Sequence, residues 1–185
     1  MWLNSEEHYG LVAVLLHWLI AVVVVGLFAL GLWMVELTYY DAWYTRAPDL
    51  HRGIGVLLSL ILVARLGWRL GNVTPRPEPG QSPLEQRIAH LMHTLLYLLL
   101  FLVIASGYLI STADGRAIDV FGLFSVPATV TGLPNQADVA GDVHLILAIA
   151  LVSLAGVHAL AALKHHFIDR DATLLRMLGR RAARR

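Results

Sequence analysis

The sequence contains no cysteine and carries little charge. Charged residues make up 15% of its 185 residues, whereas a soluble domain has about 25%. Without cysteine there can be no disulfides, iron–sulfur clusters, thioether-linked cofactors or thiol nucleophiles. The formal net charge of +1 is too small for a nucleic-acid-binding surface. These absences argue against an ordinary cytosolic enzyme and against a nucleic-acid partner.

The sequence is instead rich in hydrophobic residues, many of them in long runs. Hydrophobic residues make up 57% of the chain, and its mean hydropathy is +0.65. Four stretches reach the roughly 20 apolar residues that a helix needs to cross a bilayer. They cover about residues 11–35, 50–70, 87–112 and 143–167. Each is apolar on all sides, which indicates contact with lipid rather than one buried face. We therefore expect a single all-α membrane domain over residues 1–185, built as a bundle of four spanning helices.

Three loops join these stretches. The first, residues 36–49, holds three tyrosines and a tryptophan, as is typical of a membrane interface. The second is predicted to be extended because it contains Pro75, Pro77, Pro79 and Pro83. The third, residues 113–142, is long enough to form a short helix on the membrane or a lid, and the sequence does not choose between them.

Basic residues predict how the chain lies in the membrane. The second loop region and the C-terminal tail together hold eleven arginines and lysines. The other side holds three arginines, namely Arg46 and Arg116 in the first and third loops and Arg52 just inside the second stretch. Cytoplasmic segments carry the excess of such residues. Both termini are therefore predicted to be cytoplasmic. The opposite face, with seven carboxylates against its three arginines, is predicted to be mildly acidic.

Nine histidines stand out among so few polar residues. Ionisable side chains inside a membrane are costly and are functional candidates by default. Four of them match in depth: His51 and His144 begin helices that enter from the outer side, whereas His17 and His158 lie in the inner half. His158 lies about 21 Å beyond His144 along the helix axis. This separation is close to four full turns, so both residues occupy one face of the helix.

Two depth-matched histidine pairs predict two sites for a flat, iron-containing cofactor. Two neutral imidazoles in a dry slot without cysteine suit a b-type haem. Zinc fits less well, because it takes three or four ligands at one depth, usually with a carboxylate or thiolate. No carboxylate lies at the centre of any of the four stretches. The competing interpretation is a histidine-lined metal or proton transporter, which would be colourless.

Further polar residues near the inner end have open roles. Spacing alone would allow His93 to replace His17 or His158 as a ligand. His90, His93 and His165 could bind a quinone head, pass protons or simply anchor the membrane interface.

Two arginines are candidates for cofactor binding, because haem propionates are anionic and need charge pairing. Arg52 stands beside His51, and Arg65 lies near the inner end of the second stretch. No residue is singled out as catalytic.

Several short motifs are spread along nearly the whole chain. They are Tyr9-Gly10, Leu16-His17-Trp18, His51-Arg52-Gly53-Ile54-Gly55, Arg65-Leu66-Gly67-Trp68-Arg69, His90 with His93 and Tyr97, Ser106-Gly107-Tyr108, His144, the segment from His158 to Phe167, and the segment from Asp171 to Met177. In combination they resemble the bacterial cytochrome b561 family of small four-helix dihaem membrane proteins.

The resemblance implies a ligand set. His17 and His158 would hold the inner haem, and His51 and His144 the outer one. His93 would then not be a haem ligand. It also implies a multi-pass protein of the bacterial inner membrane that exchanges electrons with ubiquinone.

One branch of the family is similar to a superoxide oxidase, which takes an electron from superoxide outside and passes it to quinone. The alternative is an electron-carrier cytochrome without a substrate of its own, serving a periplasmic redox protein.

Overall fold

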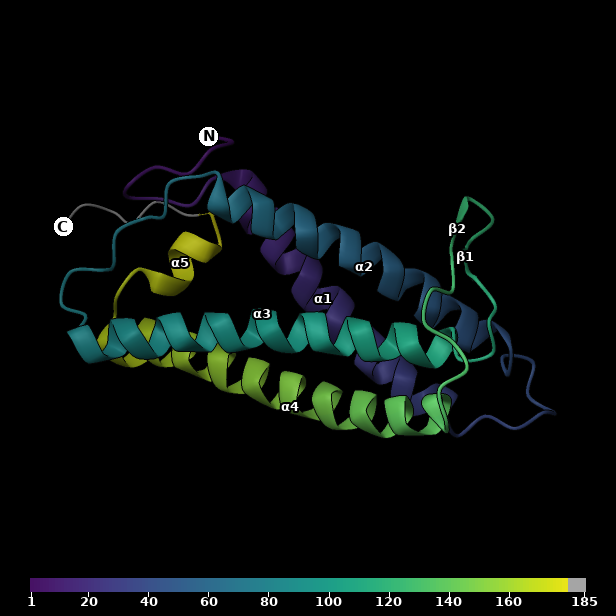
Figure 1. Cartoon of the computed structure of the whole chain (residues 1–185). Coiled ribbons are helices and arrows are strands. Elements are labelled where there is room, and N and C mark those ends of the chain that lie inside the picture. Colours follow the sequence, from purple (N-terminus) through teal and green to yellow (C-terminus); the bar gives the residue numbers. More distant parts are fainter. Residues whose placement is uncertain (180–185) are drawn as a thin grey trace. The chain divides into compact units, whose positions relative to one another are not determined.

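The computed structural model describes residues 1–179 and consists mainly of four long helices (Figure 1). They are α1 (Leu11–Met34), α2 (Arg46–Leu70), α3 (Pro83–Ser111) and α4 (Gln136–Lys164). All four are long and apolar enough to cross a membrane. The predicted architecture of four spanning helices is confirmed.

Three of the helices begin earlier than their apolar stretches predicted. The clearest case is α3, where Pro83 is helical instead of part of the extended loop. Proline suits the first helical position because no hydrogen bond from its nitrogen is needed there. Ser82 and Glu85 form a capping box: the Glu85 amide donates to Ser82 Oγ at 3.2 Å, and the Ser82 amide donates to Glu85 Oε2 at 2.8 Å.

Helix α4 also starts early, at Gln136 instead of about residue 143. The Gln136 side chain accepts from the Leu133 amide at 3.2 Å and donates to the carbonyls of Leu109 and Val130 at 3.0 Å. These bonds hold a polar first turn that hydropathy could not reveal. His144 therefore lies more than two turns inside its helix rather than at its start.

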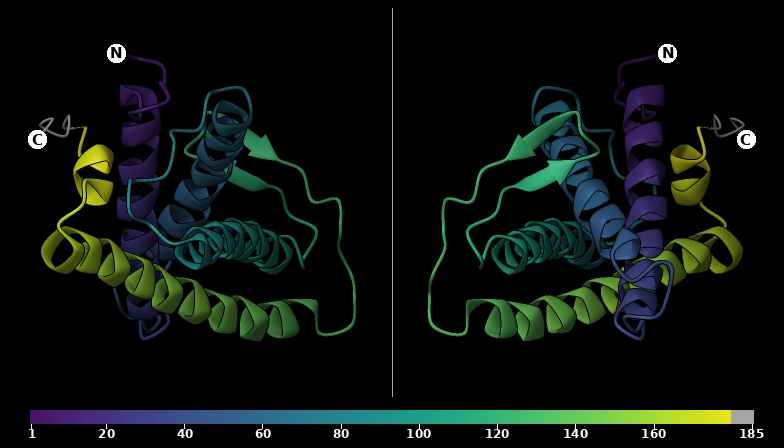
Figure 2. Two further views of the ribbon diagram at one scale, coloured as in Figure 1. Left: turned by 90° about the vertical axis from the view of Figure 1, so that its left-hand side faces the viewer. Right: turned by 90° about the vertical axis from the view of Figure 1, so that its right-hand side faces the viewer.

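The long third loop contains a β-hairpin in place of the short helix considered above. Strands β1 (Ile118–Val120) and β2 (Phe124–Val126) pair antiparallel, with Ile118 opposite Val126. Ile118 and Val120 are buried. Figure 2 shows the chain running on from β2 to the start of α4. The loop is thus ordered by a hairpin that buries two of its side chains.

The chain divides into two compact units. Each long helix is divided between them and contributes one segment to each unit. The terminal unit comprises Met1–Ala21, Ile61–Leu96 and the chain from Ser153 onward. The hairpin unit comprises Val22–Leu60 and Tyr97–Val152. Each unit contains one of the two predicted histidine pairs.

A short C-terminal segment completes the terminal unit. After α4 come a π-helical turn, η1 (His165–Asp169), and the helix α5 (Thr173–Met177). Figure 2 shows α5 beside the first turns of α1, where Trp18 Nε1 donates to the Met177 carbonyl at 2.8 Å. The sequence did not predict α5. Four arginines counted for orientation, residues 180, 181, 184 and 185, lie outside the described residues.

Candidate functional site

In the hairpin unit, His51 of α2 and His144 of α4 lie close together. Their ring centres are 6.1 Å apart, and the ring planes are inclined by 72°. A glycine of a third or fourth helix lies against each ring. A Cβ on Gly31 of α1 would be 3.3 Å from His51 Cε1, and one on Gly107 of α3 would be 3.1 Å from His144 Cε1. Both glycines therefore serve a close approach.

The two rings differ in their hydrogen bonds. His144 Nδ1 lies 3.0 Å from the Val103 carbonyl and 3.1 Å from Ser106 Oγ. A proton on Nδ1 satisfies the carbonyl and leaves Nε2 with a free lone pair, as in a metal-binding histidine. His51 Nδ1 is buried and has no hydrogen-bond partner among the described residues. Such buried unpaired atoms are uncommon in proteins.

In the terminal unit, three histidines meet. The ring centres of His17 on α1 and His158 on α4 are 6.2 Å apart, at 70°. His93 on α3 is closer to His158, at 5.2 Å and 71°. Arg65 Nη2 lies 3.0 Å from His17 Nδ1. Trp18 stands edge-on to His17, with ring centres 5.5 Å apart.

These spacings test whether the histidines fit an iron ion between them. A metal–imidazole bond is about 2 Å long, and the ring centre lies about 1 Å beyond the nitrogen, so two imidazoles on opposite sides of one ion have centres about 6 Å apart. His51 with His144 and His17 with His158 match this spacing. His93 with His158 is shorter. The donor set of each unit therefore fits a bis-histidine haem.

The two other candidates, His90 on α3 and Arg52 on α2, have different neighbours. His90 is exposed and lines an open groove of about 610 Å³ with Gln86, Arg87 and Leu91. Arg52 forms an ion pair with Asp49, one turn earlier on α2.

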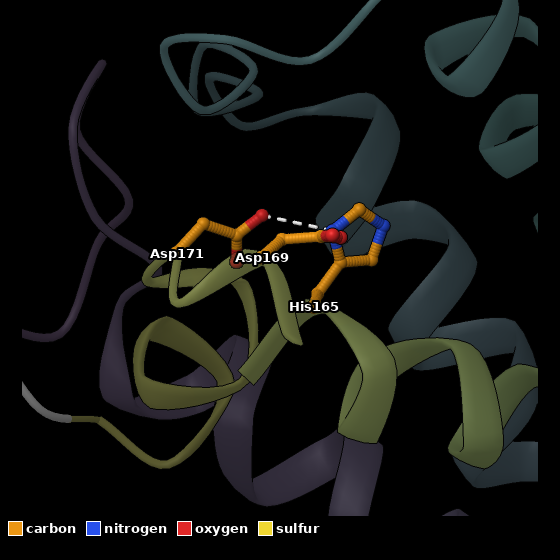
Figure 3. A group of neighbouring side chains, drawn as sticks. All are labelled: His165, Asp169 and Asp171. Atoms are coloured by element: carbon orange, nitrogen blue, oxygen red, sulfur yellow. Dashed lines mark hydrogen bonds and ion pairs between the residues drawn. The ribbon is translucent and has the colours of Figure 1, made fainter. Parts of the chain in front are cut away.

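His165 belongs to a cluster that the sequence reading missed in part (Figure 3). Its Nδ1 lies 3.0 Å from Asp169 Oδ2 and 2.8 Å from Asp171 Oδ2. Burial raises the pKa of the Asp171 carboxyl, but hydrogen bonds from Thr173 and the neighbouring His165 outweigh this and hold the pKa below its ordinary value. The signal for this cluster in the sequence is a histidine followed by aspartates four and six residues later.

The donor atoms of this cluster are close enough together to hold a metal ion. However, Lys164 Nζ lies 2.8 Å from Asp169 Oδ2. Lys164 and, when it is protonated, His165 balance the two carboxylates. The cluster therefore serves as an ion-pair network that closes the C-terminal end of α4.

Comparison with known proteins agrees with the predicted family and fold. The family model described as prokaryotic cytochrome b561 matches residues 8–180. "Cytochrome b561 homolog 2" of Escherichia coli is 54% identical over 177 residues, which cover 96% of this chain and 94% of that protein. "Cytochrome b562" of Cereibacter sphaeroides is 31% identical, covering 95% and 98%. "Probable superoxide oxidase CybB" of Yersinia pestis is 29% identical, covering 94% and 97%.

Proposed function

This chain belongs to the prokaryotic cytochrome b561 family of electron-transferring membrane proteins, and from that premise we propose that it is a dihaem b-type cytochrome. It carries electrons between a donor on the periplasmic side and ubiquinone. The observation that carries the proposal is the matched ring spacing of two histidine pairs, 6.1 Å and 6.2 Å, one in each unit. Haem b, when bound, supplies one-electron exchange.

The chain's own residues orient the ligands. The Val103 carbonyl accepts the Nδ1 proton of His144, which would leave Nε2 free to hold the iron of a haem. In the terminal unit Arg65 donates to His17 Nδ1. A histidine that gives Nε2 to a metal keeps its proton on Nδ1. Arg65 beside His17 is therefore a candidate to hold an anionic propionate.

Arg52 is the corresponding candidate in the hairpin unit. It sits next to His51 in the sequence, at the first turns of α2, and its present partner is the exposed Asp49. An exposed ion pair of this kind contributes little stability. Arg52 can therefore exchange Asp49 for a propionate with little loss of free energy.

For the electron acceptor, we place ubiquinone beside the terminal unit. Reduction of a quinone to a quinol takes two electrons and two protons. His93 lies against His158, and His90, one turn earlier on α3, lines the open groove. His90 can hydrogen-bond a quinone head in this groove, and His93, one turn further along α3, can assist it. His165 with its two aspartates can relay protons.

For the donor, we propose superoxide. The relative from Yersinia pestis carries the name of a probable superoxide oxidase. Two superoxide anions would each lose one electron to become oxygen, and one ubiquinone with two protons would become ubiquinol. The second candidate is a basic periplasmic redox protein, favoured by the excess of carboxylates over arginines in the first and third loops.

The test uses purified holoprotein in detergent. Superoxide generated enzymatically in the presence of ubiquinone is expected to reduce the haem and yield quinol, and added superoxide dismutase should abolish both. Reduction by a basic periplasmic redox protein but not by superoxide would establish the carrier role instead. Colourless protein would contradict both.

A further inference from the structure

We propose that the β-hairpin of the third loop inserts its tip into the interfacial region of the lipid bilayer, and that Phe121 holds it at that depth against α2. The tip consists of Phe121, Gly122 and Leu123, followed by Phe124 at the start of β2. The surface that it contacts is that of the membrane and not of another protein. Contact with lipid requires no haem, so its failure would leave the proposed dihaem function standing.

Large apolar side chains are exposed at the tip of the hairpin. The exposed fractions of Phe121, Leu123 and Phe124 are 46%, 77% and 42%. Apolar residues scattered singly over a surface need no explanation, but several together mark a site of contact with a membrane or a partner. The tip therefore calls for a surface that covers it.

The two faces of the hairpin differ in polarity. Val120 lies opposite Phe124, and Asp119 lies opposite Ser125. Successive residues of a strand point to opposite faces, so the first pair shares an apolar face and the second a polar one. Val120 is fully buried, whereas Phe124 and both polar residues are exposed. An element with one apolar and one polar face suits the boundary between lipid and water.

The turn places an aromatic residue where the backbone disfavours one. Phe121 has a φ of 56° and Gly122 a φ of 70°, and the Leu123 amide donates to the Val120 carbonyl at 3.0 Å. Turns with two positive φ values normally use glycine, asparagine or aspartate. A bulky residue in this conformation is strained. The side chain of Phe121, rather than the turn, therefore accounts for its presence.

The Phe121 ring lies at a defined level along α2. A Cβ on Gly53 would be 2.6 Å from Phe121 Cζ, so the ring rests against the helix backbone. Gly53 lies about 10 Å along the axis from the start of α2 at Arg46. The charged residues of this part of α2 all precede Gly53, and residues 53–64 contain none. The ring thus lies where α2 becomes apolar, which is the level where aromatic residues meet a membrane interface.

The hairpin tip lies on the side of α2 away from the histidine pair. Residues two positions apart on an α-helix are separated by about 200° around its axis. Gly53 and His51 therefore occupy nearly opposite sides of α2, and His51 lies against His144. Figure 1 shows the hairpin beside the first half of α2. This placement argues against a lid over the pair and for a position at the outer surface, continuous with the lipid-facing sides of the spanning helices.

The charged groups near the tip have partners within the loop itself. The Gly122 amide donates to Asp119 Oδ2 at 2.9 Å, and Arg116 Nε donates to Asp114 Oδ2 at 2.7 Å. Attraction to a charged protein is correspondingly weak. Burial of apolar area is then the main gain when the tip is covered. Insertion should therefore depend little on salt or on anionic lipid.

The experiment measures the depth of a spin label on the purified protein in lipid nanodiscs. The chain has no cysteine, so Leu123→Cys provides a single labelling position. Collisions of the label with oxygen, which concentrates in lipid, are compared with collisions with a water-soluble nickel complex. The oxygen-to-nickel ratio should be several-fold higher for Leu123→Cys than for the matched control Ser125→Cys on the polar face. Added salt, or anionic in place of zwitterionic lipid, should leave the ratio unchanged.

Two results would overturn the proposal. A ratio at position 123 equal to that at position 125 would place the tip in water. A label at position 123 that is shielded from both reagents would show that a protein surface, a second copy of the chain included, covers the tip.

A second pair of variants tests the part played by Phe121. In the labelled Leu123→Cys protein, Gly53→Ala adds a Cβ that must displace the Phe121 ring, so the oxygen-to-nickel ratio should fall. Gly55→Ala is the control, because a Cβ there would meet nothing within 4 Å. Both variants replace glycine with alanine in the same helix, so helix propensity changes them alike. Equal ratios in the two would show that Phe121 does not set the depth of the hairpin.

Discussion

The ring of His144 lies so close to Gly107 that a Cβ on this glycine would be 3.1 Å from Cε1 of the ring. Helix α3 supplies no member of the hairpin-unit pair, yet it sets the position of one of them through the absence of a side chain. In the same way, Gly31 of α1 leaves room for His51. The pair is therefore held by four helices, two with histidines and two with glycines.

Replacing Gly107 with valine should cost the hairpin-unit haem, because the added side chain displaces the His144 ring. The haem-to-protein ratio should fall by about half. Gly26→Val is the matched control, since a Cβ on Gly26 would meet nothing within 4 Å. Both variants place the same β-branched residue in a helix, so propensity changes them alike. Equal haem content in the two would show that Gly107 does not position His144.

Loss of the Trp18 hydrogen bond should loosen the C-terminal helix. Trp18→Phe removes the donor to the Met177 carbonyl, a bond whose net contribution is about 1 kcal/mol. Amide hydrogen exchange in residues 173–177 should accelerate roughly fivefold, the factor that about 1 kcal/mol represents. Trp68→Phe is the control, because Trp68 Nε1 has no hydrogen-bond partner among the described residues. Exchange that is equally fast in both variants would contradict the assignment.

Asp171 should make the protein sensitive to acid. Its pKa is below the ordinary value of 3.8, because the hydrogen bonds from Thr173 and the contact with His165 outweigh burial. A carboxyl with a lowered pKa stabilises the fold above its unfolded pKa, and this stability is lost as the pH falls through the folded pKa. Asp171→Asn should thus lower the thermal midpoint at pH 7, and the difference should shrink below pH 3.8. A difference independent of pH would argue for a purely packing role.

Both termini should be cytoplasmic in the bacterial inner membrane. The second loop region and the tail hold the excess of basic residues. A reporter active only in the periplasm should be silent when fused to either end and active when inserted in the loop between α1 and α2. A signal from the C-terminal fusion would reverse the assignment.

The sequence predicted the large features of the fold because bilayer thickness imposes them. An apolar run such as residues 11–35 has few alternatives to a spanning helix. Histidine depth follows from the same helical rise, which is why the sequence alone predicts that His17 and His158 lie at the same depth. The spacing could not exclude His93, because residues at similar depth on different helices are separated only by packing.

Other features depend on tertiary contacts that hydropathy does not record. The first turns of α4 are polar and are held by the bonds of Gln136. The hairpin is held by the burial of Ile118 and Val120, and α5 by the Trp18 bond. The contact of Arg65 with His17 joins two helices and has no local signal in the sequence.

The haem content of the purified protein tests the central claim most directly. A pyridine haemochrome assay and a dithionite-reduced minus oxidised spectrum should show two b haems per chain. His93→Ala should keep both, whereas His158→Ala should keep one. Loss of a haem from His93→Ala, with two retained in His158→Ala, would show that the terminal-unit pair is wrongly assigned. A wild-type protein without haem would contradict the account as a whole.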